Sequence, residues 1–216
     1  MTFADGGQRE LILRVAARLF AALGYDGTSL SQIAEAVGMS TAAVTQQVGA
    51  KRDLYLQIME DLSRAEQASL ETAIGTAPAD TPEQAAAVLR RIVDHYLDFC
   101  LAHPEVPALW MHRWLSDAGD VTEVEQKYVQ PLLRTIEDAL APAVKAGFIS
   151  SDIDLDYLLW SLGWCVHGFL AGGAIDGDGF SKTPANPEAL RDFRSFLHRM
   201  FHRTAIGLNT PPAPSR

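Results

Sequence analysis

The chain has 216 residues, enough for one domain or two small ones, of which 48% are hydrophobic and 21% charged. This composition supplies a hydrophobic core, so it excludes intrinsic disorder as the default interpretation. The formal net charge of −9 argues against indiscriminate nucleic-acid binding, because that activity needs clustered cations.

The compartment is indicated by what the sequence lacks. Cys100 and Cys165 are too few for a disulfide framework and fit a reducing cytoplasm. Charged residues such as Arg9 and Arg14 interrupt any apolar segment of a signal peptide. No apolar run reaches the ~18 residues typical of a membrane span. We therefore expect a cytoplasmic protein.

Charge is unevenly distributed along the chain. Residues 1–52 carry five cations and four anions, whereas the remainder carries 13 cations and 23 anions. A nearly neutral N-terminal segment followed by an acidic remainder of the chain indicates two domains with different functions. We expect a DNA-binding domain at 1–52, an effector-binding and dimerisation domain at 53–208, and a disordered tail at 209–216.

The first elements in chain order are three short helices. An apolar stripe at helical spacing predicts a helix over Glu10–Ala22, which Gly24 ends. Ser29 followed by Gln32 is a capping box that begins a second helix, and Gly38 stops that helix.

Ser40 caps the third helix, Thr41–Gln47, with Val44 on its inner side. Two short helices joined by the tight turn Gly38-Met39-Ser40 are typical of a helix-turn-helix. The turn needs a residue that tolerates positive φ, as Gly38 does. A short helix with small polar side chains fits a DNA major groove about 12 Å wide.

The rest of the chain is also predicted to be helical, which makes the fold all-α. Gly75–Pro82 reads as a linker, 117–120 as a turn, and 147–154 and 172–187 as loops. Pro131 and Pro142 are expected to kink or split one long helix. The expected helices span about 51–74, 83–102, 105–116, 123–145, 155–171 and 188–206.

Residues 12–58 resemble the DNA-binding domain of the TetR (tetracycline repressor) family, through the segments AARLF, GYDGTSL and IAEAVGMS and through Lys51 with Leu54. The resemblance implies phosphate contacts from Ser29, Ser31 and Lys51. It places Thr41, Ala42, Thr45 and Gln46 at the positions that face the groove.

The third helix departs from the family pattern. Thr45 stands where the family usually has an aromatic residue, Val48 where it has Phe, and Ala50 where it often has a capping Ser or Asn. No charged residue lies between Met39 and Ala50. Gln46 or Gln47 can still pair with adenine, worth roughly 1–3 kcal/mol of discrimination. We expect a different operator and weaker affinity.

Aromatic residues mark the second part. Trp110 and Trp114 are four residues apart, as are Trp160 and Trp164, so each pair shares a helix face. Each aromatic alone reads as core, but the resemblance implies a pocket for a small apolar or aromatic effector. The expected ligand-binding residues are Tyr96, Phe99, Cys100, Trp110, Met111, Trp114, Trp160, Trp164 and His167.

The last two helices are predicted to form a dimer interface. Residues 155–169 are apolar on nearly every side, and such a helix needs cover on two sides. The resemblance implies a homodimer that holds two recognition helices about 34–36 Å apart on a near-palindromic operator. The expected interface residues are Leu158, Leu162, Phe169, Phe193, Leu197, Met200 and Phe201.

The overall prediction is a ligand-responsive regulator, most simply a repressor, with no cofactor and no metal. His95, His112 or His167 is expected to hydrogen-bond an effector, and the pair His198 and His202 reads as a solvated face. Two alternatives stay open: a helical small-molecule-binding protein without DNA binding, and an enzyme in the helical bundle. Against the enzyme, no nucleophile elbow or Gly-rich phosphate loop is present.

Overall fold

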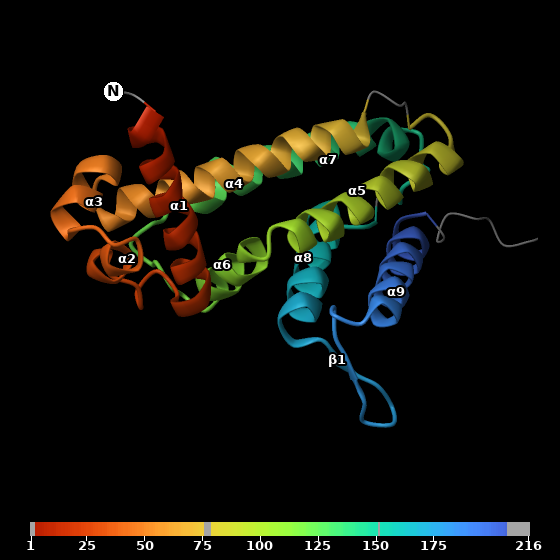
Figure 1. The fold of residues 1–216 in the computed structure, drawn as a ribbon. Helices are drawn as coiled ribbons and strands as arrows, with labels where there is room; N and C mark the ends of the chain where they lie inside the picture. The colour runs from red at the N-terminus through yellow and green to blue at the C-terminus, as the bar shows by residue number, and fades with distance from the viewer. Residues whose placement is uncertain (1–2, 76–78, 151, 207–216) are drawn as a thin grey trace, which may run out of the picture. The chain divides into compact units, whose positions relative to one another are not determined.

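The computed structural model describes residues 3–75, 79–150 and 152–206, with side chains from residue 7 onward (Figure 1). These residues form an all-α fold, as predicted, apart from one two-stranded ladder. The helices are α1 Phe3–Leu23, α2 Leu30–Ala36, α3 Thr41–Val48, α4 Lys51–Ile74, α5 Pro82–Ala102, α6 Glu105–Trp114, α7 Gln130–Lys145, α8 Leu155–Gly172 and α9 Pro187–Ala205.

The chain packs as two compact units, which divide differently from the expected domains. Unit 1 contains residues up to Ala65 together with His103–Val129. Unit 2 contains Glu66–Ala102 and the described part of Gln130–Arg216. Unit 1 takes in the later segment because Leu109 and Val124 pack into the core of the first helices. The functional boundary at residue 52 stays a prediction, and the expected tail at 209–216 lies outside the described residues.

Helices α2 and α3 begin and end within one residue of where the local signals predict, whereas α1 begins at Phe3 and not at the expected Glu10. The Gln32 N–H donates to Ser29 Oγ at 3.2 Å, and the Ser29 N–H donates to Gln32 Oε1 at 2.7 Å, which completes the capping box. Ser40 Oγ accepts a hydrogen bond from the Ala43 N–H and caps α3. Gly24 and Gly38 have φ of +77° and +68°, a region that favours glycine.

The second half differs from the expected elements in two places. The expected helix 123–145 begins instead with a π-helical turn, Glu125–Val129, before α7 starts, and Pro142 lies inside α7. The expected loop 172–187 contains β1, Ala174–Ile175, paired antiparallel with β2, Ser181–Lys182. Two-residue strands are too short to show the alternating pattern that predicts a strand.

Helix α5 is central to unit 2, since α7, α8 and α9 all pack against it. The α8 and α9 helices also meet directly, where the rings of Phe169 and Phe193 stack with centroids 4.0 Å apart. Among the described residues, no helix is long and apolar enough to cross a membrane.

Candidate nucleic-acid interface and interior polar site

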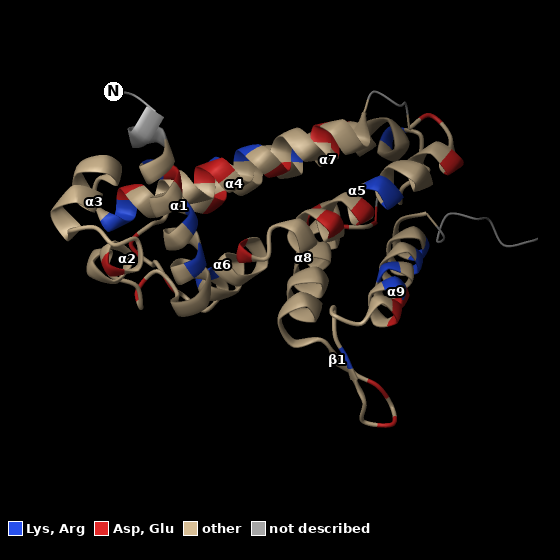
Figure 2. Ribbon diagram, viewed as in Figure 1, with Lys and Arg blue, Asp and Glu red and all other residues tan. Residues whose placement is uncertain are grey.

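Helix α3 presents a polar surface over a buried apolar base. Val44 is fully buried and Val48 is 8% exposed, and both pack into the core of unit 1. The four residues expected to face the groove are all exposed: Thr41, Ala42, Thr45 and Gln46. Figure 2 shows no charged residue along α3, so recognition by this helix depends on hydroxyl and amide groups.

Ser29 and Ser31 are both exposed at the start of α2, but their hydroxyls differ in what they already bind. Ser29 Oγ accepts the Gln32 N–H and donates to Gln32 Oε1 at 2.9 Å. Ser31 Oγ lies 3.0 Å from Ser29 Oγ. Ser29 therefore serves first as a helix cap, and Ser31 is the freer of the two hydroxyls for a phosphate.

Lys51, at the first position of α4, is tied to the turn that follows α1. Its Nζ donates to the Tyr25 carbonyl oxygen at 2.9 Å and lies 4.1 Å from the centre of the Tyr25 ring. An ammonium group has three N–H donors, so two remain for a DNA phosphate. Arg52, next to it, is paired with Glu123.

The same turn is held by Asp117, a residue that the sequence indicated only as part of a turn. Its carboxylate accepts hydrogen bonds from the Tyr25 N–H at 2.6 Å and from the Asp26 N–H at 2.9 Å. The flanking residues Ser116 and Ala118 have φ of 69° and 55°, which is costly for residues other than glycine. The segment after α6 is therefore shaped to reach the helix-turn-helix.

His112, on α6, makes another contact of this kind. Its Nε2 lies 3.1 Å from the Ala21 carbonyl oxygen near the end of α1 and serves as the donor of this hydrogen bond. The sequence offered His112 as a possible effector ligand, whereas the structure uses it to join α6 to α1. No local sequence signal predicts the contacts of His112 and Asp117, because each contact joins residues about ninety positions apart.

The interior of unit 2 contains a buried polar cluster, which we define as Glu66, Tyr96, Cys100 and His167. The Tyr96 hydroxyl lies 2.7 Å from His167 Nε2, and the two rings stack with centroids 5.8 Å apart. Burial lowers the pKa of His167 to about 4 and raises the pKa of Tyr96. The tyrosine is therefore the donor and a neutral imidazole the acceptor at pH 7.

Glu66, on α4, is the member of the cluster that the sequence did not indicate. It is 8% exposed, and no hydrogen bond to its carboxyl forms within the described residues. Burial raises its pKa to about 7, and its charge raises the pKa of both Tyr96 and Cys100. A carboxyl in these mostly apolar surroundings offers a ligand a strong polar contact.

The expected ligand-binding residues fall in different units. Trp110, Met111 and Trp114 belong to unit 1, and Trp110 packs against the core of the helix-turn-helix. The members in unit 2 are Tyr96, Phe99, Cys100, Trp160, Trp164 and His167. Trp160 and Trp164 stack with centroids 6.3 Å apart, but Trp164 is 49% exposed. Fewer of these residues therefore lie together in the interior of unit 2 than the sequence indicated.

The expected dimer interface stays a prediction. Five of its residues are buried within the protomer: Leu158, Leu162, Phe169, Leu197 and Phe201. Their helices use this side to pack against the rest of unit 2, and their other sides carry the exposed apolar groups. Tyr157, Trp164 and Phe196 are the large exposed side chains there, and Phe193 and Met200 are half-buried.

The described residues contain no group of three His, Cys, Asp or Glu side chains placed to hold a metal ion. His198 is not a solvated residue as expected, because its Nε2 donates to Asp94 Oδ1 at 2.9 Å. Both cysteines are free, and burial raises the pKa of both thiols. This direction agrees with the expectation of inert packing.

Comparison with known families gives a match to the family described as bacterial regulatory proteins, tetR family, over residues 12–58. The chain is 38% identical over 151 residues to the HTH-type transcriptional regulator AcrR of Shigella flexneri, covering 67% of this chain and 68% of that protein. It is 25% identical over 183 residues to the HTH-type transcriptional repressor AcnR of Corynebacterium diphtheriae, covering 79% and 83%.

Solved structures show the same fold at low sequence identity. The fatty acid degradation regulator FadR from Bacillus halodurans has a TM-score of 0.69 at 12% identity, over 90% of this chain and 94% of that one. A ketosteroid transcriptional regulator of Mycobacterium tuberculosis has a TM-score of 0.65 at 15% identity, over 92% and 94%.

Proposed function

The chain belongs to the TetR family of bacterial transcriptional regulators, and on that premise we propose that it is a repressor released from a palindromic operator by a small effector. The resemblance seen in the sequence is thereby confirmed. A regulator of this kind binds DNA through its helix-turn-helix, so the proposed site of action is the cytoplasm. The proposal assigns no catalytic role to any residue.

The exposed polar face of α3 above buried Val44 is the observation that carries the proposal. Gln46 is the residue proposed to read a base, because an amide side chain can pair bidentately with adenine. Thr41 and Thr45 supply hydroxyls, although the Thr45 hydroxyl already donates to the Thr41 carbonyl at 2.9 Å. Ser31 and Lys51 supply phosphate contacts that position the helix without reading sequence.

The test is a gel shift against DNA that flanks the protein's own gene, in about 50 mM salt to favour phosphate contacts. We expect a specific shift that Gln46→Ala weakens and that Glu35→Ala, on the exposed side of α2, leaves unchanged. Failure of the wild type to shift any flanking fragment would contradict the proposal and favour a binding protein without DNA activity.

Dimerisation is proposed through the exposed apolar side of α8 and α9. On α8, Tyr157 and Trp164 are seven residues apart and therefore share a face. On α9, Phe196 and Met200 are four apart and likewise share one. Large exposed apolar residues on adjacent surfaces mark an interaction site, and an isologous contact uses the same surface in both copies.

The effector is proposed to enter unit 2 at the buried polar cluster. Buried apolar residues of α5 such as Phe99 and Leu97 suit an apolar or aromatic molecule. Glu66 and the Tyr96–His167 pair then supply the few polar contacts that fix its orientation. Helix α4 contributes Glu66 to this cluster and Lys51 to unit 1. A ligand that contacts Glu66 therefore contacts the same helix that carries a proposed DNA-binding residue.

Release of DNA follows from linkage between the two binding events. A ligand changes DNA affinity only if it binds the two conformations of the protein unequally. The contacts of α6 with α1, through Asp117 and His112, are the element in unit 1 that we propose to differ between these conformations. Strained backbone at Ser116 and Ala118 is consistent with such a switching segment.

A further inference from the structure

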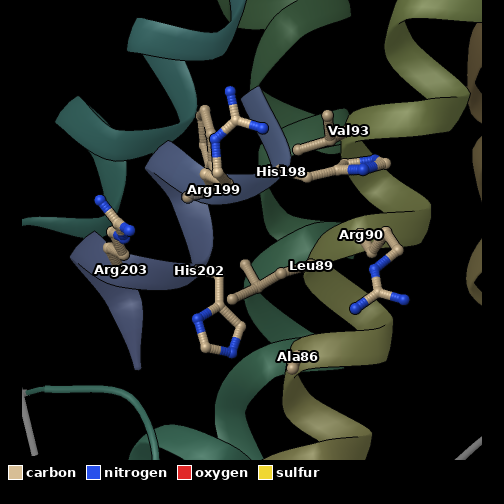
Figure 3. Close-up of a pocket in the computed structure, with 9 residues that line it drawn as sticks. Ala86, Leu89, Arg90, Val93, His198, Arg199, His202 and Arg203 are labelled. Carbon is tan, nitrogen blue, oxygen red and sulfur yellow. The ribbon is translucent and has the colours of Figure 1, made fainter. Parts of the chain in front are cut away.

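A concave site lies between α5 and α9 in unit 2, and it uses none of the residues on which the proposed function depends (Figure 3). Its volume is about 200 Å³. This is below the roughly 300–1,000 Å³ of pockets for drug-sized ligands, so the occupant must be small. Leu89 and Val93 of α5 and Phe201 of α9 supply apolar lining.

The charge of this pocket has one sign. Five of its nine lining residues are basic and none is acidic; the five are Arg90, His198, Arg199, His202 and Arg203. The chain as a whole has a formal net charge of −9, so this concentration of cations does not follow from its average composition. Cations gathered around a concave apolar surface raise the local concentration of anions.

The neighbouring acidic residues that the structure describes contact His198 but leave the three arginines of the pocket unpaired. Asp94 and Asp98 of α5 are both paired with Arg194, and Asp94 also accepts the hydrogen bond from His198. Within the described residues, Arg90, Arg199 and Arg203 form no ion pair. Three guanidinium groups beside the pocket are therefore available to an external anion.

We propose that this pocket binds a small organic anion, with a phosphate or carboxylate head held by Arg90 and Arg199. Guanidinium groups match both head groups because they offer paired N–H donors in a planar fork. The apolar part of the ligand packs against Leu89 and Val93.

The proposed anion contacts both α5 and α9, and these two helices have different proposed functions. Helix α5 carries Tyr96 of the buried polar cluster, and α9 carries Phe196 of the proposed dimer surface. A ligand that bridges α5 and α9 stabilises unit 2 by an amount that grows with the logarithm of its concentration relative to its Kd, because it binds only the folded chain. The pocket is thus a second small-molecule binding site, separate from the proposed effector site and from the DNA-binding surface.

The experiment is calorimetric titration of the full chain with phenyl phosphate and, in a second arm, benzoate. Inorganic phosphate supplies the charge without the ring, and benzyl alcohol supplies the ring without the charge. We expect binding of at least one aromatic anion, about tenfold weaker binding of inorganic phosphate, and no binding of benzyl alcohol. Binding should weaken as sodium chloride is raised, because the contacts are ionic.

Arg199→Gln and Arg90→Gln should each weaken binding by about tenfold. Both residues are exposed, so the variants should fold as the wild type does. Arg191→Gln is the matched control, since Arg191 is exposed on α9 outside the pocket and should bind as the wild type. The proposal is overturned if neither anion binds, if benzyl alcohol binds as well as the anions, or if Arg191→Gln weakens binding as much as Arg199→Gln.

Discussion

The backbone N–H of Tyr25 donates to the Asp117 carboxylate at 2.6 Å, across 92 positions of the chain. Tyr25 lies in the turn between α1 and α2, and Asp117 lies in the segment after α6. The same carboxylate accepts the Asp26 N–H, so it caps two consecutive donors of the helix-turn-helix. This contact makes the segment after α6 an integral part of unit 1.

Replacing Asp117 with alanine should leave both donors without their acceptor. We expect the free energy of unfolding of the protein to fall by about 1–3 kcal/mol, measured by urea denaturation. Asp120→Ala is the control, since Asp120 is exposed and forms no hydrogen bond within the described residues. Equal effects of the two substitutions would show that Asp117 has no special structural role.

Glu66 and His167 should give the stability of the protein opposite pH dependences. The folded-state pKa of Glu66 is raised from 4.5 to about 7, so the unfolded chain loses this proton first and stability falls as pH rises from 4.5 to 7. The folded-state pKa of His167 is lowered from 6.5 to about 4, so stability falls as pH drops from 6.5 to 4.

Glu66→Gln separates the two effects. At pH 8 the variant should gain about 3 kcal/mol relative to its difference from wild type at pH 4.5, because 1 pKa unit corresponds to about 1.4 kcal/mol. The measurement is urea denaturation of both proteins across this range. A difference between them that does not change with pH would mean that Glu66 ionises normally in the folded protein.

Gly38 should be sensitive to a side chain because of its backbone conformation alone. Its φ is +68°, but a Cβ there would meet no atom within 4 Å, so the cost is conformational rather than steric crowding. We expect Gly38→Ala to cost about 1–2 kcal/mol and Gly38→Asn less, since asparagine tolerates this region. Thermal unfolding of the two variants checks the order, and the reverse order would contradict the turn geometry.

Phe196→Glu should convert the proposed dimer to a monomer with an unchanged helical content. The side chain is 46% exposed in the protomer, so the charge disturbs a partner contact and not the core. Light scattering gives the mass and circular dichroism the helicity. Phe180→Glu is the control, because Phe180 is 71% exposed in the turn between β1 and β2. A wild type of monomeric mass would contradict the proposed interface.

The boundaries of α2, α3 and α4 could be predicted because they depend on neighbouring residues, whereas the start of α1 at Phe3 was missed. Ser29 with Gln32, and Gly38 at positive φ, are local signals that the structure confirms. The role of Asp117 could not be predicted, because nothing near it in the sequence identifies Tyr25 as its partner. The burial of Glu66 was equally hidden, since a carboxylate on a charged helix normally faces solvent.

The sequence did not show which side of α8 and of α9 packs inside the protomer, and the reason is different. Apolar residues surround α8, so the sequence showed that two sides need cover but not which side packs inside the protomer. The structure resolves this by burying Leu158 and Leu162 and exposing Trp164.

Hydroxyl-radical footprinting of the flanking DNA tests the central claim most directly, namely that two copies of α3 bind one operator. The account predicts two protected patches with related sequences, their centres about 10 base pairs or a multiple apart. Substituting Gln46 with alanine should weaken protection at both patches together. A single protected patch, or protection that persists unchanged in the Gln46→Ala protein, would contradict it.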